Sequence, residues 1–347
     1  MSSGPTRVRT GWRLVATFGV GALVLASCGT PTVSRQRLNG TPARGIAVPL
    51  TNVGCALNNY CVAVGTSSAS VGPTSVAEFS TPLGHWIPLA LPAVSSPLIT
   101  SAACTSTQCL LGGSQPNRDL LWRFDSVGHT LGVATAPPGG IGIVALNCDK
   151  LNCALVDTNA IGATPRFSSS ADGGLTWTDP VDMTWASGDA ITSLACGAVF
   201  DCVVSARTAH QQISFFITLD GGITWTQRVT PPAWTTLTSL SCAKLRCVAL
   251  VSASGGSKLV RTKNFGKTWT SVSLSAQANA LACTALASCV IVGQHTDSSA
   301  WLATVHVGTT SNALLRYVPT PLVNVACGMK VCAAIGVTTL LSVPAPH

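Results

Sequence analysis

The stretch Ile191-Thr-Ser-Leu-Ala-Cys196, a short loop, and then Cys202-Val-Val-Ser-Ala206 place a cysteine at each end of a loop between two apolar runs. Short runs rich in Val, Ile and Leu on either side of a turn are typical of strands, so this unit is predicted to be a β-hairpin. Leu237–Cys242 repeats its first half and Cys289–Gly293 its second. Facing positions in a hairpin lie close enough for a disulfide to join them.

The hairpin recurs along the whole chain. Of the fifteen cysteines, all but Cys28 fall into seven close pairs: Cys55/Cys61, Cys104/Cys109, Cys148/Cys153, Cys196/Cys202, Cys242/Cys247, Cys283/Cys289 and Cys327/Cys332. The first members of successive pairs are 41 to 49 residues apart. This period matches a four-stranded propeller blade. The sequence therefore predicts an all-β fold, a seven-bladed β-propeller over residues 46–347, with one local disulfide per blade.

Zinc binding is the alternative explanation of the cysteine pairs. Zinc sites favour pairs two to four residues apart, with two pairs meeting at one ion. Here each pair belongs to a separate repeat, and no histidine recurs beside the pairs. An even number of cysteines in an exported chain favours disulfides. We expect no metal and no cofactor.

The first residues indicate export. Three arginines precede the apolar run Leu14–Ala26, which is too short to span a bilayer comfortably. The run ends in Leu25-Ala-Ser-Cys28-Gly, which resembles a bacterial lipobox. We expect residues 1–27 to be a lipoprotein signal peptide and Cys28 to be a lipidated N-terminus on the outer face of the cell membrane. The alternatives are an ordinary signal peptide with a chance cysteine and an uncleaved anchor.

The segment 28–45 is expected to be the tether. The seventh repeat ends near Val343, before its fourth strand, and an open ring would leave two sheet edges unpaired. Some part of residues 30–45, around Val33–Leu38, is the available donor of that strand.

Composition limits the function classes. Hydrophobic residues form 47% of the chain and charged residues 9%, which excludes disorder. Three of the net eight positive charges belong to the signal peptide, and the remaining +5 is too mild to indicate nucleic-acid binding.

A second motif follows three of the hairpins. It has the pattern Ser/Thr-x-Asp/Asn-x-Gly-x-Thr-Trp, at Ser170–Trp177, Thr218–Trp225 and Thr262–Trp269. The motif resembles the Asp-box (BNR) repeats of sialidase-type propellers, and the layout is similar to seven-bladed propellers of the photosystem II assembly-factor type. The resemblance implies that Asp or Asn caps the turn, Gly has a positive φ and Trp packs into the blade. The residues concerned are Asp172, Gly174 and Trp177, then Asp220, Gly222 and Trp225, then Asn264, Gly266 and Trp269.

The inventory of reactive residues argues against an enzyme. A sialidase-like site would need an arginine triad, an aspartate and a tyrosine paired with a glutamate, whereas the chain has one glutamate, Glu78, and two tyrosines, Tyr60 and Tyr317. Nucleophile-elbow, phosphate-loop and metalloprotease motifs are also missing from the sequence. We expect no catalytic residues, with a sialidase-like glycoside hydrolase as the least favoured alternative.

The topology of a blade predicts where a ligand binds. If its strands are A to D from the centre outward, the cysteine loop (A–B) and the Asp box (C–D) share one face. The B–C and D–A loops lie on the opposite face, where rigid scaffolds often carry function. Trp185 and Trp234 fall on successive D–A loops, with Arg207 and His210 on the B–C loop between them. These four residues are the predicted ligand-binding site, and the alternative is that both Trp residues wedge between blades.

The predicted function is a membrane-anchored, non-enzymatic binding or scaffold module. Its partner would be a protein or a cell-envelope glycan, and the chain is expected to be a monomer. The alternative is an assembly-assisting factor that docks on a membrane complex.

Overall fold

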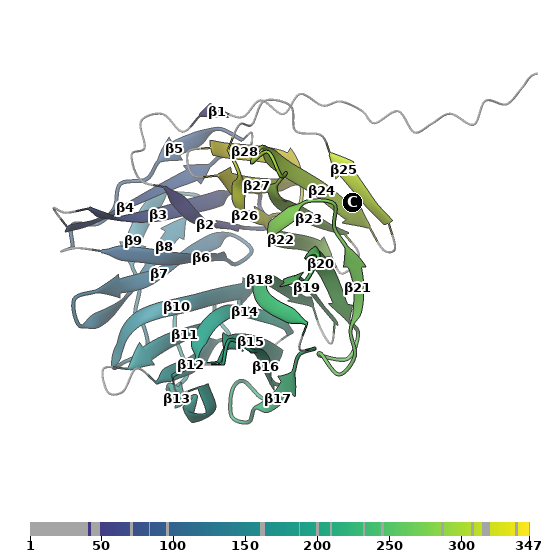
Figure 1. The fold of residues 1–347 in the computed structure, drawn as a ribbon. Helices are drawn as coiled ribbons and strands as arrows, with labels where there is room; N and C mark the ends of the chain where they lie inside the picture. The colour runs from purple at the N-terminus through teal and green to yellow at the C-terminus, as the bar shows by residue number, and fades with distance from the viewer. Residues whose placement is uncertain are drawn as a thin grey trace, which may run out of the picture. The chain divides into compact units, whose positions relative to one another are not determined.

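The structure is a computed structural model that describes residues 41–42, 49–69, 72–82, 84–94, 97–159, 164–186, 188–198, 201–208, 210–231, 233–243, 246–285, 288–306, 309–313, 320–336 and 339–346. All of them belong to the compact unit Gln36–His347. Apart from one 3₁₀ turn, Thr184–Ala186, the regular structure of these residues is β-strand. The strands form seven four-stranded antiparallel sheets, so the prediction of a seven-bladed β-propeller is confirmed (Figure 1).

Each sheet has four strands, named A to D from the channel outward. The A strands are β2 (Leu50–Cys55), β6 (Leu98–Cys104), β10 (Gly140–Asp149), β14 (Ala190–Ala198), β18 (Trp234–Ala243), β22 (Gln277–Ala285) and β26 (Leu322–Cys327). The B strands are β3 (Cys61–Ala69), β7 (Gln108–Gln115), β11 (Asn152–Asn159), β15 (Asp201–Arg207), β19 (Arg246–Ala253), β23 (Ser288–Gln294) and β27 (Val331–Gly336).

The outer half of each sheet is built the same way. The C strands are β4 (Gly72–Ser80), β8 (Arg118–Asp125), β12 (Pro165–Ser170), β16 (Ile213–Thr218), β20 (Gly256–Thr262), β24 (Ala300–His306) and β28 (Thr339–Pro344). The D strands are β5 (Trp86–Pro88), β9 (Thr130–Val133), β13 (Val181–Asp182), β17 (Thr226–Val229), β21 (Thr270–Ser273), β25 (Thr309–Ala313) and, in the seventh sheet, β1 (Thr41–Pro42).

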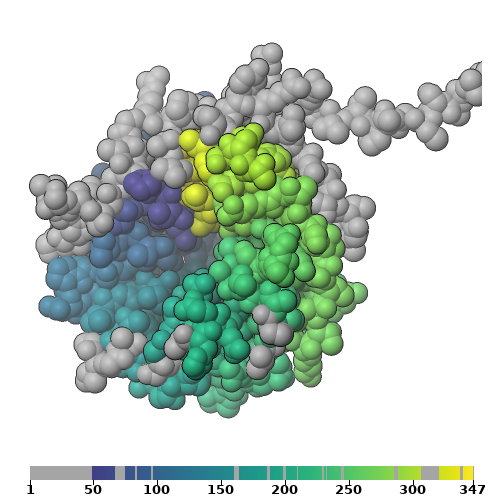
Figure 2. All heavy atoms as spheres, in the orientation of Figure 1, coloured from purple at the N-terminus to yellow at the C-terminus, as the bar shows by residue number. Residues whose placement is uncertain are grey.

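The seventh sheet joins the two ends of the unit. Its order is β1-β28-β27-β26, and Thr41 pairs with Leu340. The fourth strand therefore comes from the N-terminal side, within the predicted residues 30–45, whereas the finer choice Val33–Leu38 lies outside the described residues. On the channel side β26 contacts β2, and Figure 2 shows the purple and yellow ends of the unit side by side.

The core lies between the sheets, in seven hydrophobic clusters that each join two neighbours. A B strand is covered on both faces, so it reads as a continuous apolar run. In β15, Val203 packs toward the fifth sheet and Val204 toward the third. This alternation explains why the apolar runs after each second cysteine lack a polar face.

The seven predicted disulfides are present, one in each sheet, and this prediction is confirmed. Each joins the A strand to the B strand of its own hairpin, with paired Cα atoms 3.9 to 4.1 Å apart. Because cysteine spacing set the blade boundaries, the A–B register of every sheet follows from it. The bonds are Cys55–Cys61, Cys104–Cys109, Cys148–Cys153, Cys196–Cys202, Cys242–Cys247, Cys283–Cys289 and Cys327–Cys332.

Candidate functional site

The two ends of the sheets form two faces of different construction. The disulfide face consists of the A–B loops between paired cysteines and the C–D turns, because both connections lie at the same end of antiparallel strands. The opposite face consists of the B–C and D–A loops.

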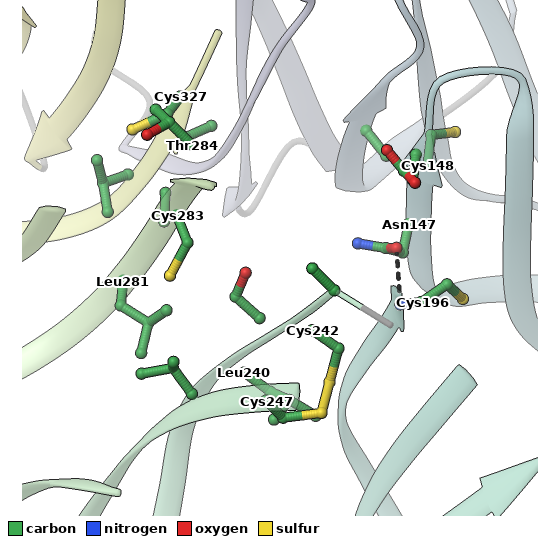
Figure 3. A pocket seen from close by; sticks show the side chains of 18 of the residues that line it. Asn147, Cys148, Cys196, Leu240, Cys242, Cys247, Leu281, Cys283, Thr284 and Cys327 are labelled. Carbon is green, nitrogen blue, oxygen red and sulfur yellow. Dashed lines mark hydrogen bonds between the residues drawn. A yellow bond between two sulfur atoms is a disulfide. The ribbon is translucent and has the colours of Figure 1, made fainter. Parts of the chain in front are cut away.

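A cavity of about 410 Å³ lies at the disulfide-face end of the channel (Figure 3). All seven hairpins contribute the first cysteine of their pair to its wall: Cys55, Cys104, Cys148, Cys196, Cys242, Cys283 and Cys327. The wall is therefore made of covalently closed hairpins. The predicted ligand-binding residues belong to the opposite face, whereas this cavity is at the other end of the channel.

The second cysteine of each pair is buried in the core, whereas the first lines the cavity. The second members are at most 3% exposed, and one of them packs in each of the seven hydrophobic clusters. The reason is that they begin or lie near the start of a B strand, which neighbouring sheets cover on both faces. Cys247 also reaches the cavity wall, whereas six do not and have a structural role alone: Cys61, Cys109, Cys153, Cys202, Cys289 and Cys332.

The A strands are linked to one another by polar side chains near the cavity. Asn147 accepts a hydrogen bond from the backbone N–H of Cys196 at 3.0 Å, the dashed line in Figure 3. Equivalent links between neighbouring sheets are made by Asn52, Thr100, Ser239, Asn279 and Asn324. Each of the six precedes a first cysteine by one to four residues. The sequence analysis did not identify these residues. The signal that could have revealed them is the polar residue that recurs within four residues before the first cysteine of a pair.

Charge in the cavity wall is concentrated on the fifth sheet. Arg246, Arg261 and Lys263 line the cavity there, and Asp149 of the third sheet is the acidic lining residue. None of the three cationic side chains has a hydrogen bond or ion pair within the described part of the chain. These cations are available to an anionic group entering from the disulfide face.

The C–D turns hold their side chains by a dense set of local hydrogen bonds. Asp172 accepts from the backbone N–H groups of Leu175 and Thr176, both at 2.9 Å, and from the Thr176 hydroxyl at 2.6 Å. Burial acts to raise the pKa of Asp172, but the bonds from Thr176 outweigh it and lower that pKa to about 2. The carboxylate is therefore ionised and fixed as the cap of the turn.

The fourth and fifth sheets repeat this turn. Asp220 and Asn264 accept from Thr224 and Thr268, each at 2.9 Å. The hydrogen bonds from Thr224 lower the pKa of Asp220 as well. The turn glycines have positive φ angles, 80° at Gly174, 95° at Gly222 and 74° at Gly266, which side chains rarely tolerate.

The three motif tryptophans pack onto the preceding sheet. Trp177, Trp225 and Trp269 belong to the clusters between the second and third, third and fourth, and fourth and fifth sheets, respectively. Trp225 meets Phe167 edge-on at 5.2 Å between ring centroids. The motif thus positions its exposed tip by anchoring its last residue in the core.

The structure corrects the predicted ligand site on the opposite face. Trp234 is only 7% exposed, and its ring meets Trp269 edge-on at 5.4 Å. Trp185 stacks on Phe216 with 3.6 Å between centroids, in the cluster between the third and fourth sheets. Both indoles are therefore wedges between sheets, the alternative considered above. Arg207 and Trp185 are half-buried and His210 is exposed, but the Trp185 ring is stacked on Phe216.

A buried charged cluster also lies at this end of the strands, between the second and third sheets. Arg166 forms a bidentate ion pair with the fully buried Asp157, at 2.7 and 2.8 Å, and donates to the Pro138 carbonyl at 3.0 Å. Asp119 is 9% exposed and lies beside Asp157. Burial and the negative charge of Asp157 raise the pKa of Asp119 to about 8.

This charged cluster is closed over rather than open. A Cβ at Gly140 would overlap the Asp119 carboxylate, so the first residue of β10 passes directly against it. The guanidinium of Arg166, on β12, is committed to Asp157. The cluster therefore serves packing between sheets.

Two further features complete the description. No group of three or more metal-ligating side chains occurs within the described ranges. Nor does any helix there have the length and apolar character needed to cross a membrane. Cys28 lies outside the described residues.

Comparison with known proteins supports the fold. No protein-family model and no curated protein matches the chain. Among solved structures, YCF48 bound to D1 peptide superposes with a TM-score of 0.63 at 12% identity, covering 92% of this chain and 100% of that one. A virginiamycin B lyase from Staphylococcus aureus with quinupristin has a TM-score of 0.63 at 8% identity, covering 89% and 99%.

An enzyme with a longer chain matches too. A GH74 xyloglucanase from Xanthomonas campestris has a TM-score of 0.60 at 13% identity, covering 88% of this chain and 53% of that one. Identities this low show the propeller fold alone, and the matching structures include both binding proteins and enzymes.

Proposed function

We propose that the chain is a non-enzymatic binding propeller of the BNR type, anchored through lipidated Cys28 on the outer face of the cell membrane. It holds a segment of a protein partner at the channel mouth on the disulfide face. The arrangement is that of a rigid scaffold which presents a few charged side chains at one end of a channel.

The cavity at the disulfide face carries this proposal. It is framed by seven disulfide-closed hairpins, and three unpaired cations stand together on its fifth-sheet side within the described part of the chain. A rigid wall lowers the entropy that binding would otherwise cost, and arginine is enriched at protein-binding hot spots. The similarity to a propeller whose structure contains a bound peptide is consistent with a segment as ligand.

Catalysis is not part of the proposal because the cavity lacks the groups for it. Its ionisable lining side chains in the described residues are Asp149, Arg246, Arg261 and Lys263. Most glycoside hydrolases need two carboxyl groups across the scissile bond. Glu78, the one glutamate of the chain, is 5% exposed on β4 and does not line this cavity.

The test is a pull-down from detergent-solubilised bacterial membranes with the lipidated protein as bait, beside a glycan array. We expect a stoichiometric protein partner that is lost from the Arg246→Glu/Arg261→Glu variant and retained by Lys258→Glu at the opposite end of β20. Retention by the double variant would overturn the site. Binding or turnover of a glycan would overturn the function.

Mass spectrometry of the mature protein tests the anchor. It should find a diacylglycerol on Cys28 and no residue before it, and cleavage elsewhere would refute the anchor.

A further inference from the structure

Exposed apolar side chains are distributed unequally between the two faces. Of the twelve large hydrophobic residues that are exposed in the described part of the chain, seven lie on A–B loops or C–D turns: Leu57, Val127, Leu151, Leu175, Leu219, Ile223 and Met329. The other five lie on strands, and none lies in a described B–C or D–A loop. Exposed apolar clusters mark interaction surfaces. The disulfide face is therefore the docking face.

Neighbouring C–D turns present different chemistry from the same backbone. Of the three variable positions of the turn, two are exposed tips: Leu219 and Ile223 on the fourth sheet, 60% and 76% exposed, whereas Lys263 and Lys267 occupy them on the fifth. The third position is Gly221 on the fourth sheet and the buried Phe265 on the fifth. The caps Asp220 and Asn264 hold both turns with matching hydrogen bonds. Because the geometry is shared, the difference between the turns is one of side-chain chemistry alone.

The apolar and cationic sectors are adjacent. The A strands β14 and β18 of these two sheets are in contact, and the cavity wall includes Cys196 of the fourth sheet as well as Arg246, Arg261 and Lys263 of the fifth. A ligand that reaches from the fourth C–D turn into the cavity would meet apolar side chains first and cations next.

We propose that the partner segment is a peptide stretch in which apolar side chains lie beside a cluster of acidic ones. The apolar residues cover Leu219 and Ile223, and the acidic residues enter the cavity against Arg246, Arg261 and Lys263. This inference rests on the proposed function, because it takes the ligand at the disulfide face to be a protein segment. Apolar contact supplies binding energy, and charge pairing fixes orientation and speeds association.

A lipid surface is the weaker match to the same side chains. The apolar tips of the third and fourth C–D turns lie beside Asp172 and Asp220, whose lowered pKa values keep them ionised. In the third A–B loop, the positive charge of Lys150 is offset by Asp149, which precedes it in the sequence. Anionic headgroups would be repelled by the carboxylates of Asp172 and Asp220, and the cations that line the cavity all belong to the fifth sheet. A short segment can match both sectors separately.

The experiment uses three fluorescent synthetic peptides of equal length and fluorescence anisotropy. The first has an apolar run beside an acidic cluster, the second has lysine in place of each acidic residue, and the third has serine in place of each apolar one. We expect the first alone to bind, with an affinity that falls as salt is raised. Lys263→Glu and Ile223→Ser should each weaken it about tenfold, which corresponds to about 1.4 kcal/mol.

Two matched controls lie on the fifth sheet. Lys258→Glu reverses a charge on β20, whose other end leads to Lys263, and Val272→Ser removes an exposed valine from β21. Neither should change the affinity, and melting temperatures verify that all four variants fold. The inference would be overturned if the three peptides bound equally, or if Lys258→Glu lost as much affinity as Lys263→Glu. It would also be overturned if the protein sedimented with anionic vesicles more tightly than it bound the first peptide. If a pulled-down partner needs Arg246 and Arg261 but is insensitive to Lys263→Glu and Ile223→Ser, this inference fails and the proposed function stands.

Discussion

The disulfide face and the opposite face terminate the same strands in different ways. At the disulfide face, covalent links and capped turns fix the backbone, so apolar and cationic tips can stay exposed. At the opposite face, Trp234 packs into the core and Arg166 is consumed by an ion pair. The tryptophan and arginine side chains that stand out in the sequence at the opposite face are used for packing between sheets. The side chains at the tips of the short turns on the disulfide face remain exposed and are available for binding.

Trp234→Ala tests the packing side of this comparison with the largest expected effect. Removing a large buried side chain leaves a cavity, so the free energy of unfolding should fall by about 3–5 kcal/mol. Chemical denaturation would measure it. Binding at the disulfide face by the folded protein should be unchanged. A variant that melts at the wild-type temperature but loses its partner would restore Trp234 as a contact residue.

Removing one disulfide tests the rigidity of the disulfide face. The double variant Cys242→Ala/Cys247→Ala should lose about 2 kcal/mol of stability, as expected for a short closed loop. It should also weaken partner binding, because this hairpin carries Arg246 beside the cavity. Cys55→Ala/Cys61→Ala is the matched control on the first sheet. It should cost similar stability and leave binding intact, and equal binding losses in both variants would argue against a local site.

Asp119→Asn sharpens the comparison through the pH dependence of stability, not through stability at a single pH. The native Asp119 keeps its proton up to about pH 8, whereas the unfolded residue loses it near its ordinary value of 3.8. The folded state thus binds the extra proton between these values, and its stability falls as pH rises through that window. Above about pH 8 the dependence on this group ends.

Asparagine does not titrate, so the variant should show a flatter decline of melting temperature between pH 5 and about 8. Its advantage over the wild type should be greatest at the alkaline end. Parallel pH profiles of the two proteins would mean that Asp119 is ionised throughout, and that the cluster between the second and third sheets is more open than described.

The cysteine spacing was enough to predict the repeat, the blade count and the seven disulfides, because each depends on residues close together in the sequence. It could not separate cavity-lining from buried members of a pair, such as Cys148 from Cys153, since that depends on how neighbouring sheets cover the B strand. The environments of Trp185 and Trp234 likewise depend on contacts with other strands or neighbouring sheets. The cavity was missed for a related reason: its wall combines one hairpin from every repeat, and its cations come from one repeat only.

Site-specific photo-crosslinking tests the central claim most directly. A photoreactive amino acid is placed at Ile223 or Met329 on the disulfide face, and at His210 or Lys258 toward the opposite face, in the otherwise unchanged full chain. After irradiation in membranes, we expect a crosslinked protein partner from Ile223, a weaker or equal product from Met329, and none from His210 or Lys258. Crosslinking confined to His210 and Lys258 would contradict the account.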